Sequence, residues 1–114
     1  MDADCLFCKI VSGTIASEQV YQDDDIISFK DIAPKAPTHL LIIPKRHIAT
    51  LNDAKTDALL LGHMTATAIH LAKQFNFAQE GYRLVWNCNQ YGGQEIYHIH
   101  LHLLGGRVLT WPPG

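Results

Sequence analysis

The sequence predicts an α+β domain, in which a five-stranded antiparallel sheet carries one long and one short helix. Five segments have the composition of strands, only one long helical pattern lies among them, and no linker divides the 114 residues. A chain of this length is expected to form one domain, residues 1–114. Because such a domain buries a modest core, a homodimer would be a natural supplement.

The N-terminal half is expected to contain the short helix and three of the strands. Asp4 would cap a helix over Cys5–Ser12, and Gly13 would end it. The strands are predicted from apolar and β-branched runs that are bounded by turn residues. These strands cover Glu18–Gln22, Ile26–Lys30 and His39–Ile43, and a loop with two prolines, Asp31–Thr38, precedes the third.

The C-terminal half is expected to contain the long helix and two strands. Between residues 52 and 76, apolar residues recur at helical spacing and would form one buried face. They are Leu60, Met64, Leu71 and Phe75. The strands are predicted at Tyr82–Cys88 and Glu95–Leu104, joined by a glycine-containing loop at Asn89–Gln94.

The composition excludes several classes of protein. Apolar residues make up 47% and charged residues 18%, with a formal net charge of −2. No apolar run approaches the ~18–20 residues of a membrane span, and the first four residues do not resemble a signal peptide. Without a polybasic run, neither nucleic acid nor a membrane is expected as a partner. Three cysteines, an odd number, favour reduced thiols and a cytoplasmic location.

Histidine is unusually frequent, with seven in the chain and three of them within five residues. Because residues of a strand alternate between faces, His98, His100 and His102 would share one face and the apolar residues between them the other. At a rise of ~3.3 Å per residue, neighbouring imidazoles of this set lie about 6.6 Å apart. This spacing lets them converge on a group the size of a phosphate.

Two kinds of chemistry fit this strand. Three histidines can bind a catalytic zinc, but ligands usually bend around the metal instead of extending over ~13 Å of strand. The alternative is nucleophilic catalysis at phosphorus. The preceding loop favours this second chemistry, because Gly92 and Gly93 can offer backbone N–H groups to an anion, while Asn87 and Gln94 can add neutral donors.

The segment His98–Leu104 resembles the signature of the histidine triad (HIT) superfamily, and other segments resemble its Hint branch, the purine nucleoside phosphoramidases. The resemblance covers nearly the whole chain. It implies a HIT-like dimer that hydrolyses purine nucleoside 5′-phosphoramidates through a covalent nucleotidyl-histidine, without a metal in catalysis. A glutamine in place of His102 would have indicated the nucleotidyltransferases. The Hint-like segments are Asp31–His39, Ile42–Lys45, Gly92–Gln94, Tyr97 and Trp111–Gly114.

The resemblance also implies roles for individual residues. His100 would be the nucleophile, with His102 and His39 supporting phosphate binding and departure of the amine. Asp31 would hold the ribose and Ile32 would line the base pocket. The residues expected on the phosphate side are Asn87, Gly93, Gln94 and Glu95.

Two further positions bear on substrate choice. Trp111 of one subunit would reach the site of its partner and help to select the leaving group. Many Hint proteins have a serine where this chain has Glu95, so only the backbone N–H of Glu95 would serve the phosphate.

Cys5 and Cys8 have the spacing of zinc ligands, and His47 and His98 would complete a tetrahedral site. Some bacterial HIT proteins have a similar set of two cysteines and two histidines that binds a structural zinc. Close Hint relatives commonly lack the cysteines. A structural zinc and a pair of partly buried thiols therefore both remain open.

Two other functions also remain open. Hydrolysis of dinucleoside polyphosphates would use similar residues on a different leaving group. A nucleotide- or zinc-binding interaction module with vestigial catalysis would retain the site without turnover. His63 and His70, seven residues apart on the long helix, are expected on the surface or in a dimer interface.

Overall fold

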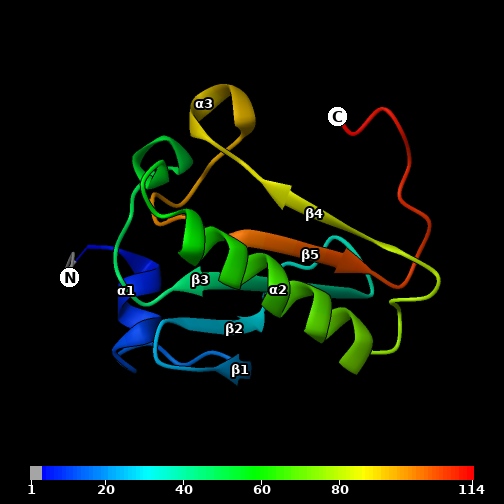
Figure 1. Cartoon of the computed structure of the whole chain (residues 1–114), viewed down its shortest axis with the longest axis horizontal. Coiled ribbons are helices and arrows are strands. Elements are labelled where there is room, and N and C mark those ends of the chain that lie inside the picture. Colours follow the sequence, from blue (N-terminus) through cyan, green and yellow to red (C-terminus); the bar gives the residue numbers. More distant parts are fainter. Residues whose placement is uncertain (1–3) are drawn as a thin grey trace.

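The computed structural model describes residues 4–114 and contains one antiparallel sheet of five strands in the order β1-β2-β3-β5-β4 (Figure 1). The α+β class and the five-stranded sheet are confirmed; residues 1–3 of the predicted domain lie outside the described part. The strands are β1 (Gln19–Gln22), β2 (Ile26–Lys30), β3 (Thr38–Pro44), β4 (Tyr82–Trp86) and β5 (Leu101–Gly105). The α-helices within residues 4–114 are α1 (Leu6–Val11), α2 (Ala58–Gln74) and α3 (Asn89–Gly92).

The long helix α2 covers one face of the sheet (Figure 1). Its residues Met64, Ala68 and Leu71, spaced four and three apart, are fully buried against apolar side chains of the central strands. Leu40 of β3 and Leu101 of β5 belong to the same cluster. This large core fixes the positions of β3 and β5, the strands that carry two of the predicted catalytic histidines.

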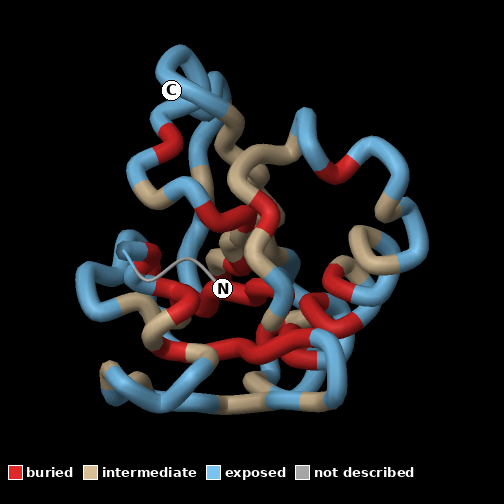
Figure 2. The backbone as a smooth tube through the Cα atoms, turned by 90° about the vertical axis from the view of Figure 1, so that its left-hand side faces the viewer, coloured by how far each residue is buried: buried red, intermediate tan, exposed pale blue. Residues whose placement is uncertain are grey.

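The opposite face of the sheet is partly covered by α1. Phe7 and Ile10 of this helix pack against Phe29 of β2 and Leu41 of β3. Figure 2 shows buried backbone along the sheet, surrounded by exposed turns. Because α1 is short, part of this face remains open, and the histidines face it.

The segment before β5 differs from the predicted strand at Glu95–Leu104, because regular pairing begins only at Leu101. The segment is held instead by the chain that follows β3. The N–H of Ile99 donates to the carbonyl of Ile48 at 2.7 Å, and His98 Nε2 lies 2.8 Å from the carbonyl oxygen of Pro44. The alternation of faces nevertheless continues, since Ile99 joins the α2 core and His98 does not.

The predicted helices also differ from the observed ones at their ends. Cys5, and not Asp4, caps α1, because its sulfur accepts a hydrogen bond from the N–H of Cys8 at 3.3 Å. The predicted helix over residues 52–76 begins only at Ala58, since a separate 3-10 turn forms at Leu51–Ala54. The predicted loop after β4 contains the short helix α3, which brings the α-helices of the described part to one more than expected. No helix described here is both long and apolar enough to cross a membrane.

Candidate active site

A cavity of about 550 Å³ lies on the open face of the sheet, beside α1. Phe7, Ile10, Phe29 and Leu41 give it an apolar wall. The rest of the lining contains both apolar and polar residues, and eight of the predicted site residues belong to it. They are Asp31, Ile32, His39, Asn87, Gly93, Glu95, His100 and His102.

His39 and His102 form a hydrogen-bonded pair across β3 and β5. In the register of these strands His102 lies opposite Leu41, and His39 is therefore its diagonal neighbour. His39 Nε2 lies 2.9 Å from His102 Nδ1. The backbone N–H of Lys35 donates to His39 Nδ1 at 3.0 Å, so the proton of neutral His39 belongs on Nε2. His39 then donates to His102, whose own proton belongs on Nε2.

His102 Nε2 is buried and has no hydrogen-bond partner in the described part of the chain. An unsatisfied buried donor costs about 1–3 kcal/mol. An oxygen of a bound ligand in the cavity would remove this cost, so His102 is prepared to receive an acceptor.

His100 is oriented by the backbone of the residue two positions before it. His100 Nδ1 lies 2.8 Å from the carbonyl oxygen of His98, an acceptor, so Nδ1 carries the proton. This leaves the lone pair of Nε2 free. The edge of Phe7 packs on the imidazole with ring centroids 5.1 Å apart, and His102 lies 4.9 Å away by the same measure. A nucleophilic nitrogen therefore stands beside a free N–H donor.

Burial keeps these imidazoles neutral. Burial lowers the pKa of His39 and of His100. The pKa of His102 falls to about 4, mainly through burial and further through the neighbouring imidazoles of His100 and His39. The carboxylate of Asp31 opposes this effect, its Oδ2 lying 3.5 Å from His39 Nε2. At neutral pH the cluster consequently offers lone pairs and N–H groups in place of positive charge.

The loop after β4 uses much of its hydrogen-bonding capacity internally. The N–H groups of Gly93 and Gln94 donate to carbonyls of Gln90 and Asn89. The side chain of Gln94, expected to be a donor to the substrate, is buried. Its amide nitrogen donates to the carbonyls of Ala49 and Ile96, and its oxygen accepts from the N–H of Asn89. Gln94 therefore holds the loop in place and does not line the cavity.

Trp111 does not lie at the cavity of its own chain. Its side chain is 80% exposed on the C-terminal tail, with the guanidinium of Arg83 at 5.8 Å from the ring centroid. Arg83 also donates to the carbonyls of Leu109 and Thr110. The tail is thus held at the start of β4 by Arg83.

The four predicted metal ligands, Cys5, Cys8, His47 and His98, come together in one cluster with all ligand atoms within 4.8 Å of one another. Cys5 Sγ lies 3.3 Å from His98 Nδ1, and Cys8 Sγ lies 3.4 Å from His47 Nδ1. Because His98 Nε2 faces the carbonyl of Pro44, it carries the proton and Nδ1 keeps its lone pair. Two thiols and two imidazoles at these distances fit a structural zinc.

A second group, Asp31, His39 and His102, satisfies the same distance criterion. Here the tautomers oppose metal binding. Since Lys35 N–H occupies His39 Nδ1, the Nε2 atom that faces the group carries a proton and offers no lone pair. The group fits a chain of hydrogen bonds better than a metal site.

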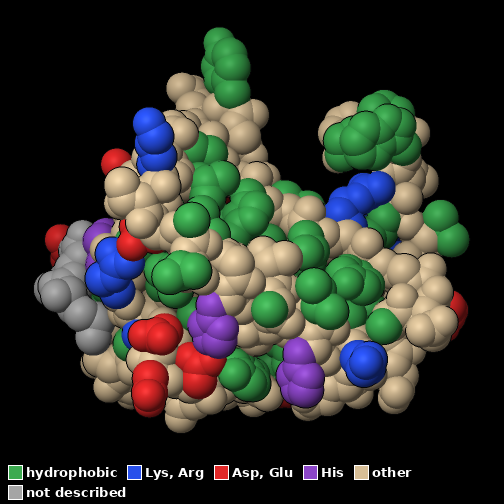
Figure 3. Space-filling view, in the orientation of Figure 1, with side chains coloured by type: hydrophobic (Ala, Val, Ile, Leu, Met, Phe, Trp, Pro, Cys, Tyr) green, Lys and Arg blue, Asp and Glu red, His purple; other side chains and the backbone are tan. Residues whose placement is uncertain are grey.

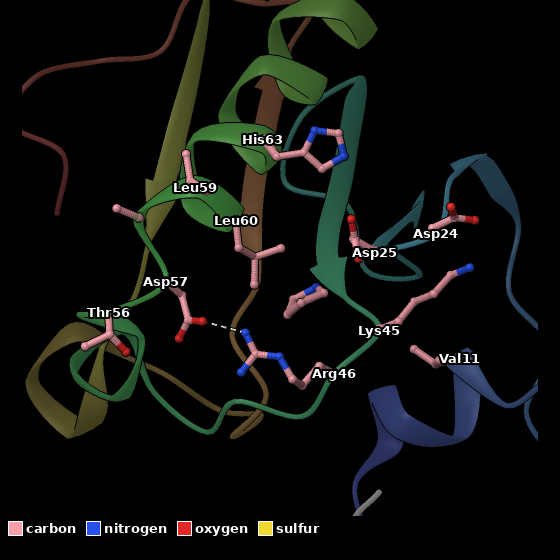
Figure 4. Close-up of a pocket in the computed structure, with 12 residues that line it drawn as sticks. Val11, Asp24, Asp25, Lys45, Arg46, Thr56, Asp57, Leu59, Leu60 and His63 are labelled. Carbon is pink, nitrogen blue, oxygen red and sulfur yellow. Dashed lines mark hydrogen bonds and ion pairs between the residues drawn. The ribbon is translucent and has the colours of Figure 1, made fainter.

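A wider depression of about 930 Å³ lies at the N-terminal end of α2 (Figure 4). Its walls carry charges of both signs: Asp24 and Asp25 lie near Lys45, and Arg46 forms an ion pair with Asp57. His63 is paired with Asp23, at 2.7 Å between Nε2 and Oδ2. These charges largely neutralise one another, so the histidine cavity is the better candidate site.

Lys35 is the site residue that the sequence did not indicate as such. Its contribution comes from a backbone N–H, which any residue except proline would supply, so no side-chain motif can reveal it. The sequence indicated the apolar wall of the cavity only in part. Phe7 and Phe29 belong to the core and also line the cavity.

Comparisons with known proteins identify the family of the chain. The HIT domain pattern matches residues 12–109. The chain is 50% identical to the purine nucleoside phosphoramidase of Escherichia coli strain K12 over 110 residues, which cover 96% of this chain and 92% of that protein.

Solved structures of the same family superpose closely. A HIT family hydrolase from Legionella pneumophila Philadelphia 1 gives a TM-score of 0.95 at 57% identity, covering 97% of this chain and 100% of that one. A histidine triad protein from Clostridium difficile gives 0.94 at 40% identity, covering 96% of both chains. These matches confirm the family resemblance and the prediction of a HIT-family hydrolase: the chain belongs to the HIT domain family.

Proposed function

We propose that the chain hydrolyses purine nucleoside 5′-phosphoramidates to the nucleoside monophosphate and an amine. The observation that carries this proposal is the juxtaposition of the free Nε2 lone pair of His100 with the unpartnered Nε2–H of His102. One can attack a phosphorus atom while the other holds one of its oxygens. The name of the Escherichia coli relative supports the choice of substrate class.

In the first step, His100 Nε2 bonds to the phosphorus and the P–N bond breaks. The imidazole keeps its Nδ1 proton on the carbonyl of His98, and the leaving nitrogen takes up one proton from solvent. The N–H of His102 stabilises the charge that grows on a phosphoryl oxygen. In the second step, water attacks the phosphorus bound to His100 and the P–Nε2 bond breaks, which releases the monophosphate, one proton and the free imidazole. The protons taken up and released balance.

The cavity supplies the remaining contacts in this proposal. Asp31 would accept hydrogen bonds from the ribose hydroxyls, and the apolar wall with Ile32 would hold the purine. On the phosphate side, the N–H of Glu95 makes no hydrogen bond within the described residues and is available to an oxygen, with Asn87 beside it. The carboxylate of Glu95 would disfavour substrates with an anionic leaving group.

We further propose a homodimer that forms along β4. This strand is at the edge of the sheet, and α3 and the C-terminal tail project on either side of a hollow above it (Figures 1 and 3). Three large apolar side chains on these projections are almost fully exposed: Tyr91, Val108 and Trp111. A second subunit would cover them and would place each Trp111 near the cavity of its partner.

A structural zinc held by Cys5, Cys8, His47 and His98 is a third part of the proposal, supported by the convergence of the ligand atoms. When bound, the metal would join the start of α1 to the segment before β5, and it would supply no catalytic step. The free thiols also support a reducing, cytoplasmic location.

The test compares turnover of an AMP–amine conjugate with turnover of a diadenosine polyphosphate. We expect the AMP–amine conjugate to be cleaved at least about tenfold faster than the diadenosine polyphosphate. His100→Ala should lower the rate of conjugate cleavage by several orders of magnitude. His70→Ala, an exposed histidine of α2, is the control and should retain the rate. Rapid quench followed by mass spectrometry should find AMP on His100. Preferred cleavage of the polyphosphate would favour the alternative hydrolase; full activity of His100→Ala would exclude this nucleophile.

A further inference from the structure

Lys35 uses both of its backbone polar groups in contacts that lead to the active site. Its N–H donates to His39 Nδ1 at 3.0 Å. Its carbonyl accepts from the guanidinium of Arg107, at 2.8 Å from Nη2 and 3.3 Å from Nε. Arg107 lies two residues after β5, and His39 lies in β3. The guanidinium therefore holds the residue that determines the tautomer of His39.

A second contact holds the same two segments together. Gly106 has a φ of +96°, and a Cβ atom at this position would lie 2.8 Å from Cβ of Pro37. The turn after β5 and the loop before β3 thus touch without room for another atom. Arg107 is itself oriented by a further hydrogen bond, from Nη1 to the carbonyl of Val108. The position of its guanidinium is consequently well defined, although the side chain is exposed.

We propose that Arg107 is a positioning residue for the His39–His102 pair. By holding the Lys35 carbonyl, it keeps the Lys35 N–H on His39 Nδ1 and so makes His102 present an N–H, and not a lone pair, to the phosphoryl oxygen. The inference deepens the proposed function and rests on it for the identity of that oxygen.

The opposite tautomers explain why this position matters. If Lys35 moved away, the proton of His39 could occupy Nδ1, and His39 Nε2 would then accept from Nδ1–H of His102. His102 Nε2 would turn an unprotonated lone pair toward the cavity. A lone pair repels a phosphoryl oxygen, whereas an N–H stabilises it. The pair is hydrogen-bonded in either state, so the contact at Lys35 favours the productive one. The carboxylate of Asp31, 3.5 Å from His39 Nε2, favours the same tautomer.

The experiment compares Arg107→Ala, Arg107→Lys and Arg83→Ala. Long-range ¹H–¹⁵N spectra of the imidazoles report directly which nitrogen of His39 and of His102 is protonated, without substrate. Rates are measured with AMP–amine conjugates that carry a small and a bulky amine. Arg107→Lys retains one donor for the Lys35 carbonyl, whereas Arg83→Ala releases the end of the tail and leaves Lys35 unchanged.

We expect Arg107→Ala to give a mixture of tautomers and to lower kcat/KM about fivefold with both amines, the loss that corresponds to one ordinary hydrogen bond. Arg107→Lys should restore the wild-type tautomers and most of the rate. Arg83→Ala should keep the tautomers, and any loss of rate should depend on the amine. Wild-type tautomers in Arg107→Ala would overturn the inference, and so would an equal effect of Arg83→Ala on the spectra. If the wild type cleaved no phosphoramidate but the spectra changed as expected, the proposed function would fail and the positioning role would stand.

Discussion

His100, the proposed nucleophile, and the three histidines near it have different partners on their ring nitrogens. A backbone carbonyl fixes the proton of His100 and of His98, whereas a backbone N–H fixes the bare nitrogen of His39. His102 is defined only through His39. Identical side chains can therefore serve in the proposed roles of nucleophile, metal ligand and donor pair, because the ring nitrogens meet groups of different polarity.

The lowered pKa of His102 predicts how the stability of the fold depends on pH. Burial lowers the pKa of His102 from its usual 6.5 to about 4, so the unfolded chain binds more protons than the folded one between these values. The free energy of unfolding should be constant above about pH 6.5 and should fall as the pH is lowered toward about 4. Urea unfolding at a series of pH values measures this. His102→Gln should reduce the slope and exposed His70→Gln should not; an unchanged slope in His102→Gln would contradict the prediction.

The grouping of the candidate residues was predictable where side chains define the candidate site. His39, His100 and His102 line one cavity, and the four cysteine and histidine ligands meet. Gln94 shows the limit: its amide was expected at the substrate, but it bonds to Ala49, which lies 45 positions earlier in the sequence. Such a long-range partner becomes visible only when the chain is folded. Lys35 and Arg107 escape prediction for the same reason, since Lys35 contributes only peptide groups and Arg107 contacts one of them from 72 positions away.

At the level of secondary-structure elements, the alternation of faces was more predictable than the limits of the strands. Side chains alternate wherever the backbone is extended, so Ile99 and His98 separate to opposite faces although β5 begins only at Leu101. The missing pairing of the predicted strand reflects the chain after β3, which captures the N–H of Ile99. The predicted start of α1 was also inaccurate, because the sulfur of Cys5, and not the side chain of Asp4, caps this helix.

Two glycines in different elements give a matched prediction about stability. Gly106 has a positive φ and lies against Pro37, so Gly106→Ala should destabilise the fold by about 1–3 kcal/mol. Gly62 lies on the exposed side of α2, with nothing within 4 Å of an added Cβ, so Gly62→Ala should stabilise by about 0.5–1 kcal/mol. Thermal unfolding of both variants checks the two signs. A neutral Gly106→Ala would show that the turn after β5 can move away from Pro37.

For the molecule as a whole, the cysteine–histidine cluster predicts a metal-dependent stability. Protein purified without chelator should contain about one equivalent of zinc, and Cys8→Ser should lose it. Without the metal, Tm should fall by roughly 10 °C, which corresponds to about 2 kcal/mol for a domain of this size. Cys88→Ser is the control, because Cys88 lies outside the cluster. Elemental analysis measures the zinc content and calorimetry measures Tm. If the metal-free wild type had the same Tm as the zinc-loaded protein, Cys5 and Cys8 would be buried thiols and not ligands of a structural metal.

The proposed dimer predicts complementation between two defective chains. His100→Ala lacks the nucleophile, and Trp111→Ala lacks the side chain that would reach the partner. After unfolding and refolding an equal mixture, the mixed dimer should contain one complete site. For a substrate that requires Trp111, about a quarter of the wild-type activity should return with random pairing. Wild-type chains refolded alone provide the reference. Recovery no greater than the sum of the two separate variants would exclude a tail that acts across the interface.

The position of His39 and His102 in interior strands of the sheet has a consequence for how the protein loses activity. β3 and β5 each have a neighbouring strand on both sides, whereas β1 and β4 form the borders. Amide protons of the interior strands should therefore exchange with deuterium only when the entire sheet opens. Brief fraying of a border strand or of the tail leaves His39 and His102 in place. Heating or denaturant should accordingly abolish turnover in the same cooperative transition that removes the sheet.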